Sequence, residues 1–331
     1  MKTSKELLAI INEYIDNINY DRQPQSLYEP IKYVLSLGGK RIRPILMLLA
    51  YNMYKEDIEA VIPCACGIET YHNFTLLHDD LMDNADMRRG KETVHKKWNA
   101  NMAVLSGDTM LVTAFSRMAE CDAKHMPDVI RLFTKTALEI DEGQQYDIEF
   151  ESRNDVCEEE YIEMIRLKTS VLLACAMQIG AILADASKED RHNLYMFGEK
   201  LGLSFQLQDD YLDVYGDPKV FGKNIGGDII ENKKTFMLIN ATKLAEGDDK
   251  AELEKWCSFS AEQVMTGDCD RNEKIKAVTG IYDKLGIGKL AKQRMEAYYQ
   301  EALSHLDAVS VPESNKAQLR EFAANMMKRE K

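Results

Sequence analysis

The stretch LLHDDLMDNADMRRG, residues 76–90, places four aspartates within eight positions and follows them with two arginines and a glycine. The residues before it, from about Asp57, have the apolar spacing of a buried helix. Asp79, Asp80 and Asp83 form the pattern D-D-x-x-D, in which Asp79 and Asp83 lie one above the other on a helix face. Carboxylates in this arrangement can chelate a shared cation, so the stretch predicts a helix that ends in a metal site.

A second copy of the pattern comprises Asp209, Asp210 and Asp213, within FQLQDDYLDVYGD, and it also follows an apolar helical run. A single acidic helix end is usually a solvated surface, but two matching copies favour a shared function. Facing carboxylates repel one another and raise one another's pKa unless cations intervene. Hard oxygen ligands suit Mg²⁺, which commonly bridges carboxylates to substrate phosphates.

The composition restricts the class of protein. The 331 residues carry a formal net charge of −13, which argues against nucleic acid or an anionic membrane surface as a partner. We find no run of eighteen or more apolar residues and no signal peptide, so we expect a cytoplasmic protein without a membrane span. The seven cysteines include no C-x-x-C pair, which fits a reducing compartment.

Helical periodicity dominates the chain. Glycine (18) and proline (7) are scarce, and we find no repeated period-two alternation, so we predict an all-α protein with one domain over residues 1–331. A capping box of Ser26 and Glu29 is expected to open the second helix, and Pro44 the third. The other helices are expected at about residues 4–23, 57–83, 100–120, 127–150, 158–184, 189–215, 233–246, 249–265, 272–308 with a break near Gly286, and 312–329.

Basic residues accompany the acidic motifs and could bind an anion. GGKRIRP, residues 38–44, combines a flexible glycine turn with three cations at a helix start. Arg88 and Arg89 directly follow the first acidic motif, and the planar guanidinium group suits phosphate oxygens. Lys168, Lys223 and Lys233 carry little weight singly, because a lone lysine is usually a surface residue.

Taken in order, the motifs resemble those of the trans-isoprenyl diphosphate synthase family, also called polyprenyl synthetases. The resemblance covers about residues 30–240, and its motifs are GGKRIRP, IETYHNFTLLHDDLMDNADMRRG, LKTS, EGQQYDIEF, FQLQDDYLDVYGD and FGKNIGGDIIENKKT. It implies the single-domain isoprenoid synthase fold, with many helices around a central active-site cavity. It also implies a homodimer.

The resemblance further implies roles for individual residues. Three Mg²⁺ ions would be held by Asp79, Asp83 and Asp209, with support from Asp80, Asp210 and Asp213. The diphosphate of the allylic substrate would be bound by Arg88, Lys168, Lys223 and Lys233. The diphosphate of isopentenyl diphosphate would be bound by Lys40, Arg43, His72 and Arg89, while Thr169 and Gln206 would line the allylic site.

The implied reaction is a condensation of isopentenyl diphosphate with dimethylallyl, geranyl or farnesyl diphosphate. The aspartates with their Mg²⁺ ions, together with Lys168 and Lys223, would stabilise the departing pyrophosphate, so that the allylic bond ionises and a head-to-tail 1'-4 coupling follows. Phe74 and Thr75, one turn before Asp79, would form the floor of the pocket and limit the product to fifteen or twenty carbons, with geranylgeranyl diphosphate slightly favoured.

Two alternatives remain open on the sequence. E-x-x-H occurs at Glu69/His72 and Glu92/His95, which could indicate a di-iron carboxylate bundle, but the second copy lies in a polar stretch typical of a loop. A non-catalytic regulatory subunit of a prenyl synthase would have the same fold. Such subunits typically lose one acidic motif, and both motifs are present here.

Overall fold

The computed structural model describes residues 1–217 and 225–328, and helices form nearly all of its regular structure. The all-α prediction is confirmed. Lys223 lies outside the described residues. Among those residues the strands are confined to one antiparallel hairpin, β1 (Met87–Arg88) and β2 (Lys91–Glu92), which was not predicted from the sequence. Arg89 and Gly90 both have positive φ, the conformation that closes a two-residue hairpin turn.

The described residues form two compact units, each assembled from separate segments of the chain. The segments of unit 1 are Met1–Lys135, Cys175–Tyr195 and Val309–Leu319, and those of unit 2 are Thr136–Ala174, Met196–Ala308 and Arg320–Lys331. Four helices contribute to both units: α7 (Met126–Ser152), α9 (Val171–Leu183), α10 (Lys188–Tyr215) and α18 (Glu313–Met327). The expectation of a single domain stays a prediction.

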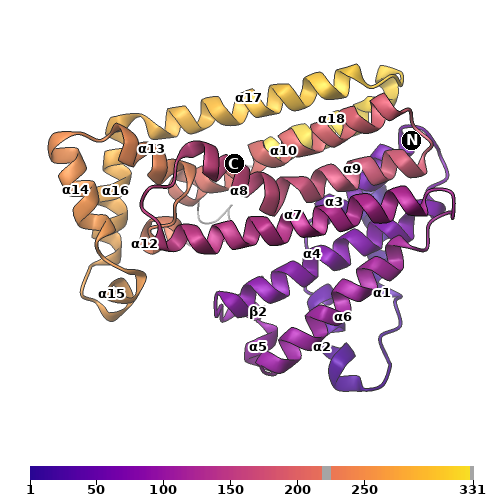
Figure 1. Ribbon diagram of the computed structural model, residues 1–331, viewed down its shortest axis with the longest axis horizontal. Coiled ribbons are helices and arrows are strands. Elements are labelled where there is room, and N and C mark those ends of the chain that lie inside the picture. Colours follow the sequence, from indigo (N-terminus) through magenta and orange to yellow (C-terminus); the bar gives the residue numbers. More distant parts are fainter. Residues whose placement is uncertain (218–224, 329–331) are drawn as a thin grey trace. The chain divides into compact units, whose positions relative to one another are not determined.

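Unit 1 is built around one long helix, α4. The elements wholly within it are α1 (Ser4–Asp16), α2 (Gln25–Ser36), α3 (Ile42–Asn52), the 3-10 turn η1 (Glu59–Val61), α4 (Ile62–Met82), the hairpin, α5 (Val94–Lys97) and α6 (Ala100–Met118). Helix α4 packs against α6 and α3, and α2 also covers α6 (Figure 1). Nearly every residue of α4 from Cys64 to Leu77 is buried, so the helix carries its acidic C-terminal end on a rigid core.

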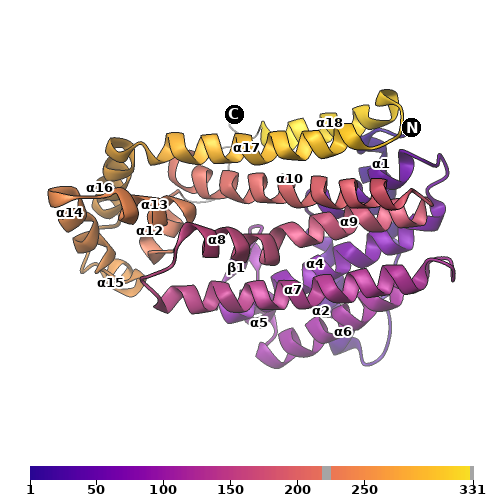
Figure 2. The ribbon, with the colours of Figure 1, turned by 45° about the horizontal axis from the view of Figure 1, so that its top comes forward.

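Unit 2 has its own core. Its elements are α8 (Glu158–Ile165), the π-helical segment η2 (Arg166–Ser170), α12 (Gly227–Glu231), α13 (Phe236–Leu244), α14 (Gly247–Cys257), α15 (Ala261–Thr266), α16 (Arg271–Leu285) and α17 (Ile287–Ala308). Figure 2 shows α14, α15 and α16 gathered at one end of this unit. Ser204 of α10 donates a hydrogen bond to the carbonyl of Met295 in α17, and Leu207 and Phe236 lie fully buried in the core.

Several predicted helix boundaries were wrong. Helix α2 begins at Gln25 after Pro24, and it has no side-chain cap because proline has no side-chain oxygen. Ser26 therefore lies inside the helix, and Glu29 accepts a hydrogen bond from the side chain of Gln25 instead of completing a capping box. The helix predicted from Asp57 begins only at Ile62, with a proline in its first turn. The breaks after Ile165 and Cys257 were also missed. The break at Gly286, which has a φ of 70°, is confirmed.

One segment, Glu158–Leu183, is long and apolar enough to cross a membrane by length and composition, and its most apolar 18-residue window has a mean hydropathy of 1.4. Its most apolar window is 78% buried inside the structure, as in the core helix of a soluble protein. Arg166 and Lys168 interrupt its sequence, which is why it contains no uninterrupted apolar run of eighteen residues.

Candidate active site

The first acidic motif lies at the C-terminal end of α4, in unit 1. The backbone N–H of Asp83 donates to the carbonyl of Asp79 at 2.8 Å, so helical geometry continues through the motif. Asp79 is partly buried and Asp83 is exposed. The expected helix is present, and successive turns carry these two carboxylates on one face.

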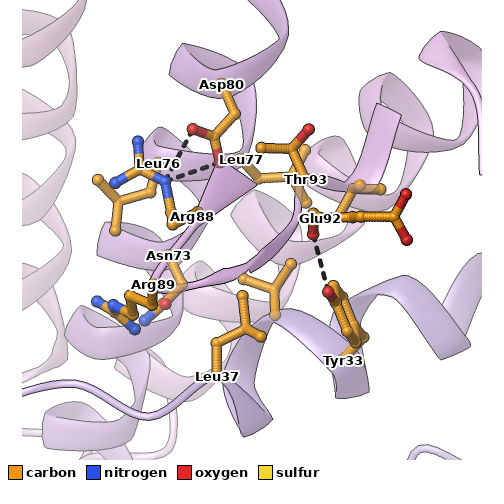
Figure 3. Close-up of a pocket in the computed structure, with 12 residues that line it drawn as sticks. Tyr33, Leu37, Asn73, Leu76, Leu77, Asp80, Arg88, Arg89, Glu92 and Thr93 are labelled. Carbon is orange, nitrogen blue, oxygen red and sulfur yellow. Dashed lines mark hydrogen bonds and ion pairs between the residues drawn. The ribbon is translucent and has the colours of Figure 1, made fainter. Parts of the chain in front are cut away.

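Asp80 points elsewhere and holds the hairpin. Its side chain is buried, and both of its carboxylate oxygens accept hydrogen bonds from Nε of Arg88, at 2.8 and 2.7 Å. Figure 3 shows this pair, with the guanidinium group of Arg89 lying apart from it. The two adjacent arginines therefore have different surroundings, because they sit at successive positions of a tight turn.

The GGKRIRP turn folds back onto Arg89. Nη1 of Arg89 donates a hydrogen bond to the carbonyl of Gly38, and a methyl group at Gly39 would lie 3.0 Å from the guanidinium group of Arg89. Arg41, with a φ of 48°, is buried and donates to the Glu69 carboxylate at 2.8 Å and to the Leu35 carbonyl at 2.9 Å. This buried ion pair fixes the left-handed backbone of Arg41, which lies between Lys40 and Arg43 in the sequence.

Cationic side chains are concentrated around His72. Burial and then the charges of Arg43, Arg89, Arg88 and Arg41 hold the pKa of His72 well below its ordinary value. Burial also lowers the pKa of Arg43 to about 10, although Glu69 opposes the effect. Four of the residues expected to bind an anion therefore lie in one region, where an anion would relieve their mutual repulsion.

Phe74, one of the two residues expected to set product length, is buried in unit 1. Its ring lies 5.5 Å from that of Tyr71 and 4.8 Å from that of His78. Thr75 is partly exposed, and its hydroxyl donates to the carbonyl of His72 at 2.8 Å. A bulky aromatic group thus lies just over one turn before Asp79 on the same helix.

The second acidic motif lies near the end of α10, in unit 2. Asp210 is buried, accepts a hydrogen bond from the Tyr161 hydroxyl, and lies 3.4 Å from Nε2 of Gln206. Burial, and then the charge of Asp228, raise the pKa of Asp210 to about 7. The carboxylate of Asp213 accepts a hydrogen bond from the backbone N–H of Asp228 at 3.0 Å, and Asp209 is partly buried.

Lys168 and Thr169 lie on the π-helical segment η2. Nζ of Lys168 donates to Oδ2 of Asp147 at 2.6 Å, and the Thr169 hydroxyl donates to Oε1 of Gln206 at 3.3 Å. A Cβ atom at Gly143 of α7 would lie only 2.3 Å from the backbone nitrogen of Lys168, so this close packing requires glycine. Short π-helical segments frequently occur at functional sites.

Lys233, just before α13, shares the carboxylate of Asp147, with Nζ 3.6 Å from Oδ2. Burial lowers the pKa of Lys233, but the charges of Asp147, Asp228 and Asp210 raise it by more, so it lies above its ordinary value. Burial raises the pKa of Asp147, but the charges of Lys233 and Lys168 lower it by more, so it lies below its ordinary value. Both lysines are therefore gathered on one carboxylate.

Comparisons with known proteins identify the family of the chain. Residues 24–268 match the polyprenyl synthetase family model. The chain belongs to the polyprenyl synthetase family. A short chain isoprenyl diphosphate synthase from Methanocaldococcus jannaschii is 43% identical over 254 residues, which are 76% of this chain and 77% of that protein.

Solved structures of other polyprenyl synthetases share the fold. A geranylgeranyl pyrophosphate synthase superposes with a TM-score of 0.93 at 42% identity, covering 100% of both chains. A polyprenyl synthase from Caulobacter crescentus, complexed with calcium and isoprenyl diphosphate, gives a TM-score of 0.82 at 25% identity over 98% of this chain and 96% of that one. The predictions of the family, the isoprenoid synthase fold and the short-chain trans-prenyltransferase type are confirmed.

Members of this family use a divalent metal. In residues 1–217 and 225–328, no three His, Cys, Asp or Glu side chains are grouped so that they could enclose an ion by themselves. Such a grouping is not required, because Mg²⁺ usually binds one or two carboxylates together with waters and substrate phosphates. The hard oxygen donors of the two motifs therefore fit a metal that is bound jointly with a diphosphate.

Three residues of this polyprenyl synthetase were given no role in the metal and diphosphate sites that the family resemblance implied. Asp147 gathers Lys168 and Lys233, Tyr161 bonds to Asp210, and Glu69 holds Arg41. Gly143, within EGQQYDIEF, could have drawn attention to Asp147, because a glycine inside a long helix often marks a close approach of another backbone. No local pattern identifies the other two, since their partners lie 49 and 28 residues away in the sequence.

The di-iron alternative gains no support. Glu69 is engaged by Arg41 and by the side chain of Asn73, and burial lowers the pKa of His72 among arginines. Contrary to the sequence interpretation, His95 lies not in a loop but on the four-residue helix α5. A helix of that length provides no core scaffold of the kind that di-iron bundles use.

Proposed function

We propose that this protein condenses isopentenyl diphosphate with an allylic diphosphate to give an all-trans prenyl diphosphate of fifteen to twenty carbons. The primer would be dimethylallyl, geranyl or farnesyl diphosphate, and geranylgeranyl diphosphate is the favoured product. The observation that carries the proposal is the likeness over the full chain to a geranylgeranyl pyrophosphate synthase, at 42% identity. Both acidic motifs and the basic motifs around them are present in this chain.

The two diphosphates would bind different cations. The isopentenyl diphosphate would bind Lys40, Arg43, His72 and Arg89, which is supported by the concentration of positive charge around His72. The allylic diphosphate would bind Arg88, Lys168, Lys223 and Lys233, which is supported by the two lysines gathered on Asp147. Thr169 and Gln206, which share a hydrogen bond, would contact the allylic substrate near its reacting carbon.

Asp79, Asp83 and Asp209 would hold three Mg²⁺ ions, and Asp80, Asp210 and Asp213 would orient these ligands and their neighbours. Bound Mg²⁺ would neutralise the allylic diphosphate and stabilise the pyrophosphate that leaves. The hydrogen bonds of Asp80 to Arg88 and of Tyr161 to Asp210 support an orienting role, because each fixes one carboxylate of a motif.

The reaction needs no protein nucleophile. The cations named above would stabilise the leaving pyrophosphate, so that the allylic carbon–oxygen bond breaks and leaves an allylic cation. The alkene of isopentenyl diphosphate would attack this cation and form the new carbon–carbon bond. Loss of one proton then gives a product five carbons longer, together with pyrophosphate.

The protein is also proposed to act as a homodimer. Helix α6 exposes Val104, Leu105 and Val112, whose exposed fractions are 42%, 52% and 68%. Large apolar side chains clustered on one exposed helix favour an interface between proteins. A second copy of the chain is the partner that the family resemblance implies.

The test is an assay of the purified protein with Mg²⁺, isopentenyl diphosphate and each allylic primer in turn, followed by dephosphorylation and identification of the prenyl alcohols. We expect geranylgeraniol as the main product, and none after chelation of the metal. An Asp86→Asn variant is a matched control, because Asp86 lies outside the D-D-x-x-D pattern and pairs with Lys96. If the protein forms no product with any of the primers, the result would favour the alternative of a non-catalytic regulatory subunit.

A further inference from the structure

Lys274 of α16 is a fully buried lysine outside the residues described so far. Its Nζ donates three hydrogen bonds, to the Ile230 carbonyl at 3.1 Å, to Oδ1 of Asn232 at 2.9 Å and to the Phe259 carbonyl at 2.8 Å. Buried lysines are rare and are normally paired with a carboxylate. These three acceptors are neutral oxygens that saturate the three donors of the ammonium group.

The three acceptors belong to separate segments. Ile230 lies in α12, Asn232 caps that helix with a φ of 53°, and Phe259 lies in the loop between α14 and α15. Asn232 adds two bonds of its own, from Nδ2 to the carbonyls of Cys257 at 3.1 Å and Phe259 at 2.9 Å. Lys274 is therefore the centre of a network that ties the end of α12 to the neighbouring helices.

The network ends next to Lys233. The backbone N–H of Lys233 donates to the Asp228 carbonyl at 2.9 Å, and its carbonyl accepts the N–H of Thr235 at 2.8 Å. The main chain of Lys233 is thus held on both sides, directly after the left-handed Asn232. Its side chain extends to Asp147, which also binds Lys168.

We propose that Lys274 is a positioning residue for Lys233: by fixing the turn at Asn232, it directs Lys233 toward the allylic diphosphate. This inference rests on the proposed function. An apolar side chain in place of Lys274 would remove its hydrogen bonds from all three oxygens, although the Phe259 carbonyl would keep its bond from Asn232. The turn would then move to hydrate the oxygens that are left without a donor. Lys233 would then lose its fixed approach to the site, although it would keep its charge.

The kinetic test compares Lys274→Met with Lys276→Met, a control that removes an exposed lysine from the same helix. We expect Lys274→Met to raise the KM for the allylic diphosphate about tenfold, the loss of roughly one charged hydrogen bond, and to leave the KM for isopentenyl diphosphate within twofold. The assay is run at a temperature at which circular dichroism shows each variant folded. Equal changes in both KM values would indicate general damage and overturn the proposal.

A second pair of variants tests whether Lys274 acts through Asn232. Asn232→Gly keeps the left-handed conformation, which glycine adopts easily, but removes the side chain. It should reproduce the rise in the allylic KM, and the double variant with Lys274→Met should be no worse than the worse single variant. If the two substitutions raised the allylic KM additively, Lys274 and Asn232 would not act through the same turn, and the proposal would be contradicted.

A readout without substrate separates this inference from the proposed function. Amine acetylation followed by mass spectrometry reports how freely each lysine reacts, and Lys233 should react faster in Lys274→Met than in the natural protein. If the natural protein makes no prenyl product, the proposed function fails, while the acetylation result still decides the role of Lys274. An unchanged rate at Lys233 would overturn the inference.

Discussion

At the scale of single residues, carboxylates determine how the cationic side chains are held. Asp80 binds Arg88, Glu69 binds Arg41, and Asp147 gathers Lys168 and Lys233. In each case the cation has a defined position before any substrate arrives. Preorganised donors of this kind stabilise developing charge without reorganisation during the reaction.

Phe74 provides the first prediction at this scale. Phe74→Ala should shift the product toward chains longer by one or more five-carbon units, because it removes the ring proposed to close the pocket. The product alcohols are identified by chromatography. Phe133→Ala is the matched control, since Phe133 is also buried and contacts Tyr71, and it should leave chain length unchanged. An unchanged product distribution in Phe74→Ala would refute the assignment.

The pKa of His72 leads to a prediction about stability. In the unfolded chain this histidine takes up a proton as the pH falls through about 6.5, whereas burial and the nearby arginines keep it neutral in the folded protein. The unfolded state therefore binds more protons, and stability is lost as the pH falls below that value.

His72→Gln removes this contribution. Its free energy of unfolding should fall less steeply between pH 7 and 5 than that of the natural protein, by at most about 1.4 kcal/mol per pH unit. Urea denaturation at several pH values measures the slopes. His192→Gln, which alters an exposed histidine of the same unit, should not change the slope. If the free energy of unfolding fell with the same slope in all three proteins, the prediction would be contradicted.

At the scale of elements, the segment η2 depends on a glycine in another helix. Gly143→Ala would place a methyl group 2.3 Å from the backbone of Lys168, so we expect a loss of about 1–3 kcal/mol in the free energy of unfolding and a lower kcat/KM for the allylic substrate. Gly280→Ala, in the middle of α16 with open space around it, should instead stabilise the protein by up to about 1 kcal/mol. Equal effects of the two substitutions would refute the packing argument.

The elements also indicate how far the sequence could be interpreted. Apolar periodicity located most helices, and the two acidic motifs lie on helices as expected. Apolar periodicity could not distinguish the π-helical turn of η2 from the α-helix around it, because the two differ in backbone hydrogen bonding rather than in apolar spacing. The hairpin was missed because its strands have two residues each, too few for an alternating pattern.

For the proposed site, the sequence indicated residue types better than pairings. Motif order pointed to the aspartates and to most of the basic residues that are proposed to form it. The pairing of Asp147 with two lysines, and the buried bond of Arg41 to Glu69, arise from tertiary contacts that no local spacing encodes. Lys274 illustrates the same limit, since in the sequence it resembles any other lysine of a charged helix.

At the scale of the whole molecule, the exposed apolar side chains of α6 make the oligomeric state testable. Val112→Glu should convert the dimer to a monomer, because it places a charge among Val104 and Leu105 in the proposed interface. Light scattering after size-exclusion chromatography gives the molar mass. Met265→Glu, at a residue 80% exposed on α15, should remain dimeric. A natural protein that is monomeric at assay concentrations would refute the homodimer.

The carboxylate of Asp147 has a consequence for turnover. Because it already pairs with Lys168 and Lys233, the diphosphate proposed to bind these lysines would compete with it, and binding would be an exchange of anions rather than an addition. The same exchange would run in reverse when pyrophosphate departs, because Asp147 would pair with the lysines again. Such an internal competitor would speed the release of pyrophosphate as well as weaken the binding of substrate.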